Sequence, residues 1–112
     1  MISNTLKSGV TQLVADELRT ANENYPLFAS NHEAYAVIKE ELEEAEDELK
    51  EFKYHIGNLW NMTKENLNCT DQFDIMKRRA MLLAQEAIQL AAMCLKGIAS
   101  EGERSNQEHE QE

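Results

Sequence analysis

Residues 39–52, KEELEEAEDELKEF, place eight acidic side chains in fourteen positions. Carboxylates gathered in this way can coordinate a hard divalent cation such as Mg²⁺ or Mn²⁺, and one of them can take a proton from an attacking water. At helical steps of about 100° per residue, three acids fall within a sector of about 60° beside the apolar positions of the segment: Glu41, Glu44 and Glu48. The acids pointing away from that side are Glu40, Glu43 and Asp47. We therefore take the first three as candidate metal ligands.

A second polar stripe interrupts an apolar stretch further along the chain, and its members are Arg78, Gln85, Glu86, Gln89 and Lys96. If the two stripes face each other, three or four carboxylates converge, and they repel one another unless a cation neutralises them. A metal so placed binds substrate phosphates and activates a water for attack. Spacing alone, however, favours two ordinary solvated helix faces, so a further observation is needed.

Helices have to position these side chains, because residues that lose little rotamer freedom in a helix dominate the chain and strand signals are nearly absent. A first helix within residues 1–24 should end before Tyr25 and Pro26, since the residue preceding a proline is pushed out of the helical region. A second helix over residues 31–67 carries apolar residues at alternating spacings of four and three. Gly57 and the Asn-rich stretch after it allow a break in that helix.

A third helix, over residues 72–99, is apolar on most of its surface. Two other helices in a chain of 112 residues can hardly cover it, so we expect a homodimer or homotetramer that completes the helical bundle. Residues 1–99 then form a single all-α domain. Residues 100–112 have no apolar periodicity and are predicted to be a disordered acidic tail.

Charge and composition exclude several classes of partner. The formal net charge of −10 disfavours a nucleic-acid polymer or an anionic membrane, because either would be repelled at long range. No secretory signal and no unbroken apolar run of membrane-spanning length is evident. Cys69 and Cys94 are too few for a disulfide scaffold and lack zinc-finger spacing. We expect a cytoplasmic protein with reduced cysteines.

The order of two sequence motifs along the chain supplies the further observation that helical spacing alone does not give. HEAYAVIKEELEEAEDEL, residues 32–49, followed by AQEAIQLAAMCLK, residues 84–96, resembles the MazG-like branch of the all-α nucleoside triphosphate pyrophosphatases, in particular its short, often phage-associated members. Members of that branch carry an E-E-x-x-E element on one helix and an E-x-x-D element on the next. The carboxylates of these elements bind Mg²⁺ and the triphosphate. The first element is matched by Glu40, Glu41 and Glu44, and the second begins at Glu86. The resemblance covers roughly residues 25–98.

One residue departs from the family pattern. Gln89 stands where the last aspartate is expected, and a neutral amide is a poorer Mg²⁺ ligand. Similar short MazG-like proteins carry a glutamine at this place, so the resemblance allows a working variant as well as an impaired site. Glu48, one turn beyond Glu44, is a substitute ligand inferred from helical spacing and not from the family pattern.

The resemblance implies Mg²⁺- or Mn²⁺-dependent release of pyrophosphate from a nucleoside triphosphate. Its metal ligands would be Glu41, Glu44 and Glu86, with Gln89 completing the shell and one of these carboxylates or Glu40 acting as general base. Lys96 and Arg78 are candidate phosphate contacts, and the candidates for base stacking are His32, Tyr35 and Trp60. For these last three, a surface or core role is the more common one. The alternatives are an impaired MazG-like protein that binds nucleotide or assembles, and a purely structural helical interaction protein.

Overall fold

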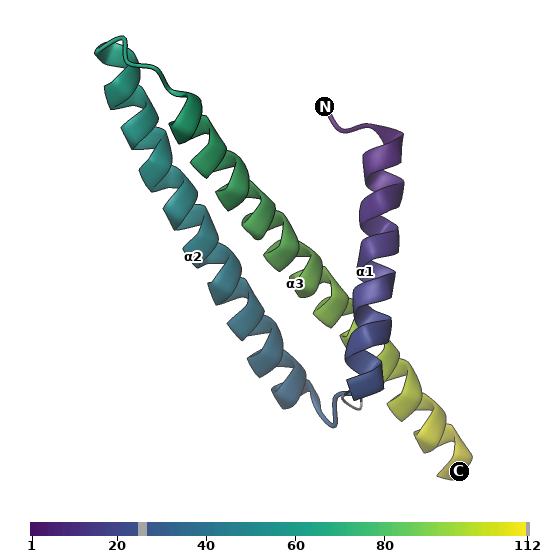
Figure 1. Cartoon of the computed structure of the whole chain (residues 1–112). Coiled ribbons are helices and arrows are strands. Elements are labelled where there is room, and N and C mark those ends of the chain that lie inside the picture. Colours follow the sequence, from purple (N-terminus) through teal and green to yellow (C-terminus); the bar gives the residue numbers. More distant parts are fainter. Residues whose placement is uncertain (25–26, 112) are drawn as a thin grey trace. The chain divides into compact units, whose positions relative to one another are not determined.

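The computed structural model describes residues 1–24 and 27–111, apart from the side chains of Asn24 and residues 108–111. It contains three helices, α1 (Asn4–Asn24), α2 (Asn31–Lys64) and α3 (Thr70–Gln111), and no strand within these residues (Figure 1). The predicted all-α class is confirmed. The Tyr25-Pro26 pair lies outside the described residues.

Side chains next to the helix ends explain where the helices begin. Ser3 Oγ accepts a hydrogen bond from the Leu6 N–H at 3.0 Å, and Ser30 Oγ accepts one from the Glu33 N–H at 3.2 Å. The Glu33 carboxylate in turn accepts a hydrogen bond from the Ala29 N–H at 3.4 Å. These contacts satisfy donors that have no partner within the first turn of a helix, as in a capping box.

The end of α2 is a Schellman motif. Asn66 has a positive φ of 58°, its N–H donates to the Thr63 carbonyl at 3.1 Å, and the Leu67 N–H donates to the Met62 carbonyl at 3.0 Å. Asparagine tolerates this left-handed conformation better than most residues, so it suits the position that ends the helix.

Two sequence expectations differ from the structure. No break occurs at Gly57, and α2 is one helix from Asn31 to Lys64, because the cost of about 1 kcal/mol for a helical glycine is too small to interrupt a long helix. Instead of a disordered tail beyond residue 99, α3 continues to Gln111. This extension contains no proline, and Arg104 binds it to α2 through a 2.7 Å hydrogen bond to the Asn31 side chain.

The chain divides into two compact units, each described by itself. The first comprises Met1–Glu41 and Ile88–Glu112. Its core consists of Phe28, Ala34, Ala92 and Met93, against which the apolar side of α1 packs through Val14, Leu18 and Ala21. The Phe28 N–H donates to Ser100 Oγ at 2.9 Å, and that hydroxyl donates to the Lys96 carbonyl at 2.8 Å. A buried polar link therefore joins the loop before α2 to α3.

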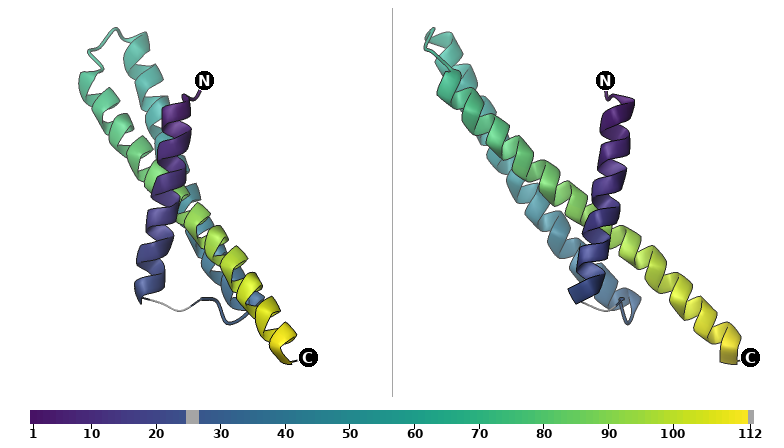
Figure 2. Two further views of the ribbon diagram at one scale, coloured as in Figure 1. Left: turned by 90° about the vertical axis from the view of Figure 1, so that its right-hand side faces the viewer. Right: turned by 45° about the vertical axis from the view of Figure 1, so that its right-hand side comes forward.

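The second unit, Leu42–Ala87, is a helical hairpin. Its parts of α2 and α3 run antiparallel and side by side in both Figure 1 and Figure 2. Near the turn, the buried Gln72 side chain donates a 3.0 Å hydrogen bond to the His55 carbonyl. Because the two helices run antiparallel, a residue early in the α2 part of the hairpin lies opposite a residue late in its α3 part.

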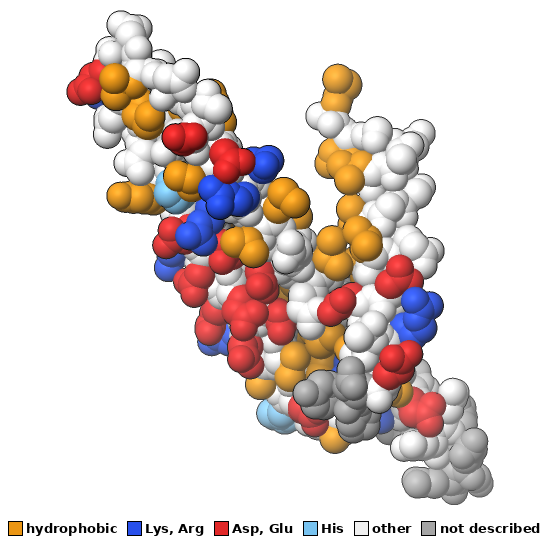
Figure 3. Space-filling model, viewed as in Figure 1, with side chains coloured by type: hydrophobic (Ala, Val, Ile, Leu, Met, Phe, Trp, Pro, Cys, Tyr) orange, Lys and Arg blue, Asp and Glu red, His pale blue; other side chains and the backbone are white. Residues whose placement is uncertain are grey.

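Many apolar side chains stay exposed in both units. Figure 3 shows them along α1, where they include Leu6 and Leu13, and the hairpin exposes Trp60, Phe73 and Met81. By length and composition alone, the Thr70–Gln107 part of α3 is apolar enough to cross a membrane, because it contains an 18-residue window with a mean hydropathy of 1.3, of which only 17% is buried. Apolar helix surface of this extent is typical of sites where protein or lipid binds.

Candidate metal centre

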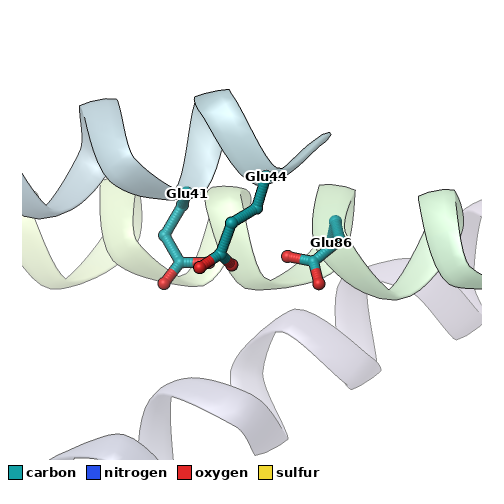
Figure 4. Close-up of side chains that lie close together, drawn as sticks. All are labelled: Glu41, Glu44 and Glu86. Carbon is teal, nitrogen blue, oxygen red and sulfur yellow. The ribbon is translucent and has the colours of Figure 1, made fainter. Parts of the chain in front are cut away.

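Three of the predicted ligands come together in the structure. One carboxylate oxygen from each of Glu41, Glu44 and Glu86 lies within 4.8 Å of those of the other two. Figure 4 shows Glu41 and Glu44 descending from the same side of α2, with Glu86 of α3 pointing toward them. Glu41 precedes Glu44 by about one turn of a continuous helix, so their common direction follows from helical periodicity. Three carboxylate oxygens this close can share one divalent cation.

The hairpin places Glu86 in an environment that resists its negative charge. Burial raises the pKa of Glu86 above its usual value, and a hydrogen bond with Glu44 and the negative charges of Glu44 and Glu48 raise it further. A cation bound here would favour the ionised form of Glu86, because metal ligands must be deprotonated.

Glu48 lies beside this group but outside it. Its carboxylate faces Arg79 Nη1 at 3.8 Å, which is an ion pair too long to include a hydrogen bond. The Glu48 Oε2 atom is buried without a hydrogen-bond partner. Glu48 therefore contributes negative charge near Glu86, while Arg79, which we had not singled out from the sequence, is the cation paired with it.

Gln89 and Lys96 line a cavity of 430 Å³ in the first unit, and Glu41 lines the same cavity. Lys96 is only 5% exposed, and its ammonium lies 4.9 Å from the centre of the Phe28 ring. Two further acids line this cavity, Glu17 of α1 and Glu33 of α2. The metal candidate Glu41 thus also belongs to a cavity large enough for a small molecule.

The other predicted site residues are neither among the residues that line this cavity nor among the three carboxylates. Glu40 is exposed on α2. Arg78 pairs with Asp74 at 2.9 Å, and hydrogen bonding by Lys77 with the charge of Arg78 lowers the pKa of Asp74. Arg78 is therefore occupied by a local ion pair on an exposed surface.

The aromatic candidates and His32 are likewise separate. His32 and Tyr35 line a small cavity of 210 Å³ at the start of α2, and the Tyr35 side chain is largely exposed. Trp60 is exposed on the hairpin, with the Lys64 ammonium 5.8 Å from the centre of its ring. None of these rings lines the cavity that contains Gln89.

Sequence reasoning missed Glu17 and Glu33 as possible ligand contacts. Glu17 did carry a signal, because it lies on the same side of α1 as the packed residues Val14, Leu18 and Ala21. An acid on the apolar side of a helix is costly unless it has a role or a partner. Glu33 gave no comparable signal, since a helix N-terminus alone explains an acid there.

Neither a protein-family model nor a curated protein nor a solved structure matches this chain. The chemistry must therefore be argued from the residues. Three converging carboxylates can hold Mg²⁺ or Mn²⁺, and the cavity that Glu41 lines can hold an organic group.

Proposed function

We propose that this chain is a Mg²⁺- or Mn²⁺-dependent nucleoside triphosphate pyrophosphohydrolase of the MazG-like type, acting in house-cleaning or phage-associated nucleotide metabolism. The observation that carries the proposal is the convergence of Glu41, Glu44 and Glu86 to within 4.8 Å. The motif order in the sequence supports it, because these are the residues that the MazG-like resemblance assigns to the metal. The substrate would be split at its α–β anhydride bond, consuming one water and giving a monophosphate and pyrophosphate.

The carboxylates have separable roles. Glu41, Glu44 and Glu86 would hold the ion, which when bound neutralises phosphate charge and polarises a water. Glu44 is the most exposed of the three, so it can accept a proton from that water and pass it to solvent. Gln89 lies about one turn beyond Glu86 on α3, and its amide oxygen can orient the water or complete the ligand set.

Release of pyrophosphate from a panel of nucleoside triphosphates with Mg²⁺ tests this proposal. We expect turnover that a chelator abolishes, and a loss of at least about tenfold for Glu86→Gln, since even residues that only support metal ligands have effects of that size. Glu43→Gln is the matched control, because Glu43 lies on the same helix as Glu44 and is exposed outside the group of three. No release from any standard or common modified triphosphate contradicts the enzyme assignment.

A nucleotide-binding protein with impaired hydrolysis is the second candidate, and Gln89 is the observation that favours it. Only three carboxylates converge among the described residues, where the family pattern has four. Binding of a nucleotide with Mg²⁺ but without pyrophosphate release identifies this case. Failure of both binding and release leaves a purely structural helical role.

We also propose a cytoplasmic homodimer or homotetramer in which the exposed apolar surface of the hairpin is covered by a second copy of the chain. Trp60 is 60% exposed and Phe73 is 58% exposed, so the hairpin presents large apolar surface that a second copy could bury. A formal net charge of −10 opposes insertion next to anionic lipid.

A further inference from the structure

Lys96 is a buried ammonium that forms no ion pair with any of the described residues. It is 5% exposed, and its ammonium lies over the Phe28 ring, 4.9 Å from the ring centre. Burying an ammonium is costly unless hydrogen-bond acceptors replace the water it has lost. Lys96 lines the 430 Å³ cavity, so an acceptor on a bound molecule could meet it there.

The charge balance of the cavity excludes two classes of occupant. Glu17, Glu33 and Glu41 line it together with Lys96, so its lining is net negative when all four are charged. A polyphosphate would be repelled by this lining. A second metal ion is not indicated either, because the only grouping of three metal-ligating side chains within the described residues is that of Glu41, Glu44 and Glu86.

An uncharged molecule with polar edges fits the lining. The cavity walls include the apolar side chains of Phe28, Val37 and Met93, while the polar groups offer both acceptors and a donor. Cavities that bind small molecules have volumes of about 300 to 1,000 Å³ and combine apolar walls with a few placed polar groups. A flat heterocycle matches this description.

We infer that this cavity holds the nucleobase of the substrate, and that it selects a base carrying both a ring carbonyl and an exocyclic amino group, namely cytosine or guanine. The Lys96 ammonium donates to the carbonyl oxygen, and the Glu17 and Glu33 carboxylates accept from the amino group. The inference rests on the proposed function. It also extends beyond the region of the MazG-like resemblance, since Glu17 belongs to α1.

Each polar residue excludes a different base. Thymine and uracil carry a carbonyl where cytosine carries its amino group, so an acceptor would face the carboxylates and only the ring N–H is left to donate. Adenine carries an amino group where guanine carries its carbonyl, so a donor would face the Lys96 ammonium and only ring nitrogens are left to accept. Polar groups that are left unpaired in a largely buried site produce strong discrimination.

Equilibrium binding of the four deoxynucleoside monophosphates, measured by calorimetry with Mg²⁺ present, tests the inference without any requirement for hydrolysis. We expect dCMP or dGMP to bind at least about tenfold more tightly than dTMP and dAMP. Two matched pairs isolate the amino group: dCMP against dUMP, and dGMP against dIMP.

Three variants assign the contacts. Glu17→Gln and Glu33→Gln should reduce the preference for dCMP over dUMP, or dGMP over dIMP, by about tenfold, and Lys96→Met should remove the preference over dAMP. Glu33→Gln keeps an oxygen that can accept from the Ala29 N–H, so the start of α2 is preserved. Glu23→Gln on α1 is the control, because Glu23 does not line this cavity.

The outcomes separate this inference from the proposed function. Base-selective binding without pyrophosphate release keeps the nucleobase site and rejects hydrolysis. Pyrophosphate release at equal rates from all four triphosphates, or equal binding of the four monophosphates, overturns the nucleobase site and leaves hydrolysis standing. A Lys96→Met variant that folds, as judged by circular dichroism, and retains the full preference for cytosine or guanine also overturns it.

Discussion

Glu44 of α2 and Glu86 of α3 bring carboxylate oxygens to within 4.8 Å of each other inside the helical hairpin. Burial raises the pKa of Glu86 above its usual value, and because two ionised carboxylates repel, the charge of Glu44 raises it further. The pair is thus a site at which a proton and a divalent cation compete. This competition gives measurable consequences for stability, metal binding and turnover.

The first prediction concerns pH. The pKa of Glu86 is raised in the folded chain above its usual value of 4.5, so between these two values the folded state binds more protons than the unfolded state. The contribution of Glu86 to the free energy of unfolding is therefore fully present at low pH and is lost as the pH rises through the raised pKa. Urea denaturation of metal-free protein, from about pH 4 to about pH 7, measures it.

General repulsion among the acidic side chains gives a trend of the same sign, so the comparison must be with Glu86→Gln. We expect the metal-free variant to lose stability less steeply with rising pH and to melt about 2 to 4 °C higher than the natural chain near neutral pH. Identical pH profiles for the two proteins would show that folding does not raise the pKa of Glu86.

Metal binding is the second prediction. Mg²⁺ at about 100 times its dissociation constant should add about 2.7 kcal/mol to the free energy of unfolding of the natural chain. Glu44→Gln and Glu86→Gln should each lose most of this gain, whereas Glu43→Gln should keep it. Differential scanning calorimetry with Mg²⁺ and then with chelator provides the measurement, and an equal gain in Glu44→Gln excludes the site.

Helical periodicity accounts for the part of this site that the sequence could predict. Glu41 and Glu44 share a side of α2 because residues three apart lie on the same side of a helix, and this follows from their numbers alone. That Glu86 faces Glu44 depends on an antiparallel hairpin, which the order of two long apolar-sided helices and a short turn favours.

Other features depend on tertiary packing that one sequence does not specify. The cavity lined by Glu17 and Lys96 exists only because α1 packs on the core around Phe28, and no local pattern fixes that packing. Gly57 does not break α2, because the low helix propensity of one glycine costs less free energy than the cooperative hydrogen bonding of a long helix supplies. The continuation of α3 past residue 99 was missed for a related reason, since Arg104 supplies a contact with Asn31, which is distant in sequence.

The third prediction addresses Gln89. Replacing it with aspartate adds a fourth carboxylate about one turn beyond Glu86, so Mg²⁺ affinity should rise about tenfold, because affinity for hard cations increases with the number of charged ligands. Pyrophosphate release should rise with it if the natural chain is impaired. Tighter Mg²⁺ binding with slower release shows instead that the Gln89 amide belongs to a working site.

Assembly is the fourth prediction. Trp60→Glu should shift the protein from dimer or tetramer to monomer in sedimentation equilibrium, because an ionised carboxylate cannot be buried against an apolar partner surface. Asn61→Glu is the matched control, since it adds the same charge at the neighbouring exposed position of α2. An unchanged oligomer in Trp60→Glu excludes this part of the hairpin from the interface, and a natural chain that sediments as a monomer rejects the proposed assembly.

The fifth prediction concerns the link that holds the cavity together. Ser100 is 1% exposed, and its hydroxyl accepts from the Phe28 N–H at 2.9 Å. Ser100→Ala leaves that N–H buried without a partner, which should lower the free energy of unfolding by about 1 to 3 kcal/mol. Ser105→Ala, an exposed change on the same helix, should have almost no effect.

Since Phe28 also supports the Lys96 ammonium, Ser100→Ala should weaken monophosphate binding as well. Urea denaturation and calorimetry measure the two effects, and equal stability of the two alanine variants would remove the argument that this hydrogen bond positions Phe28.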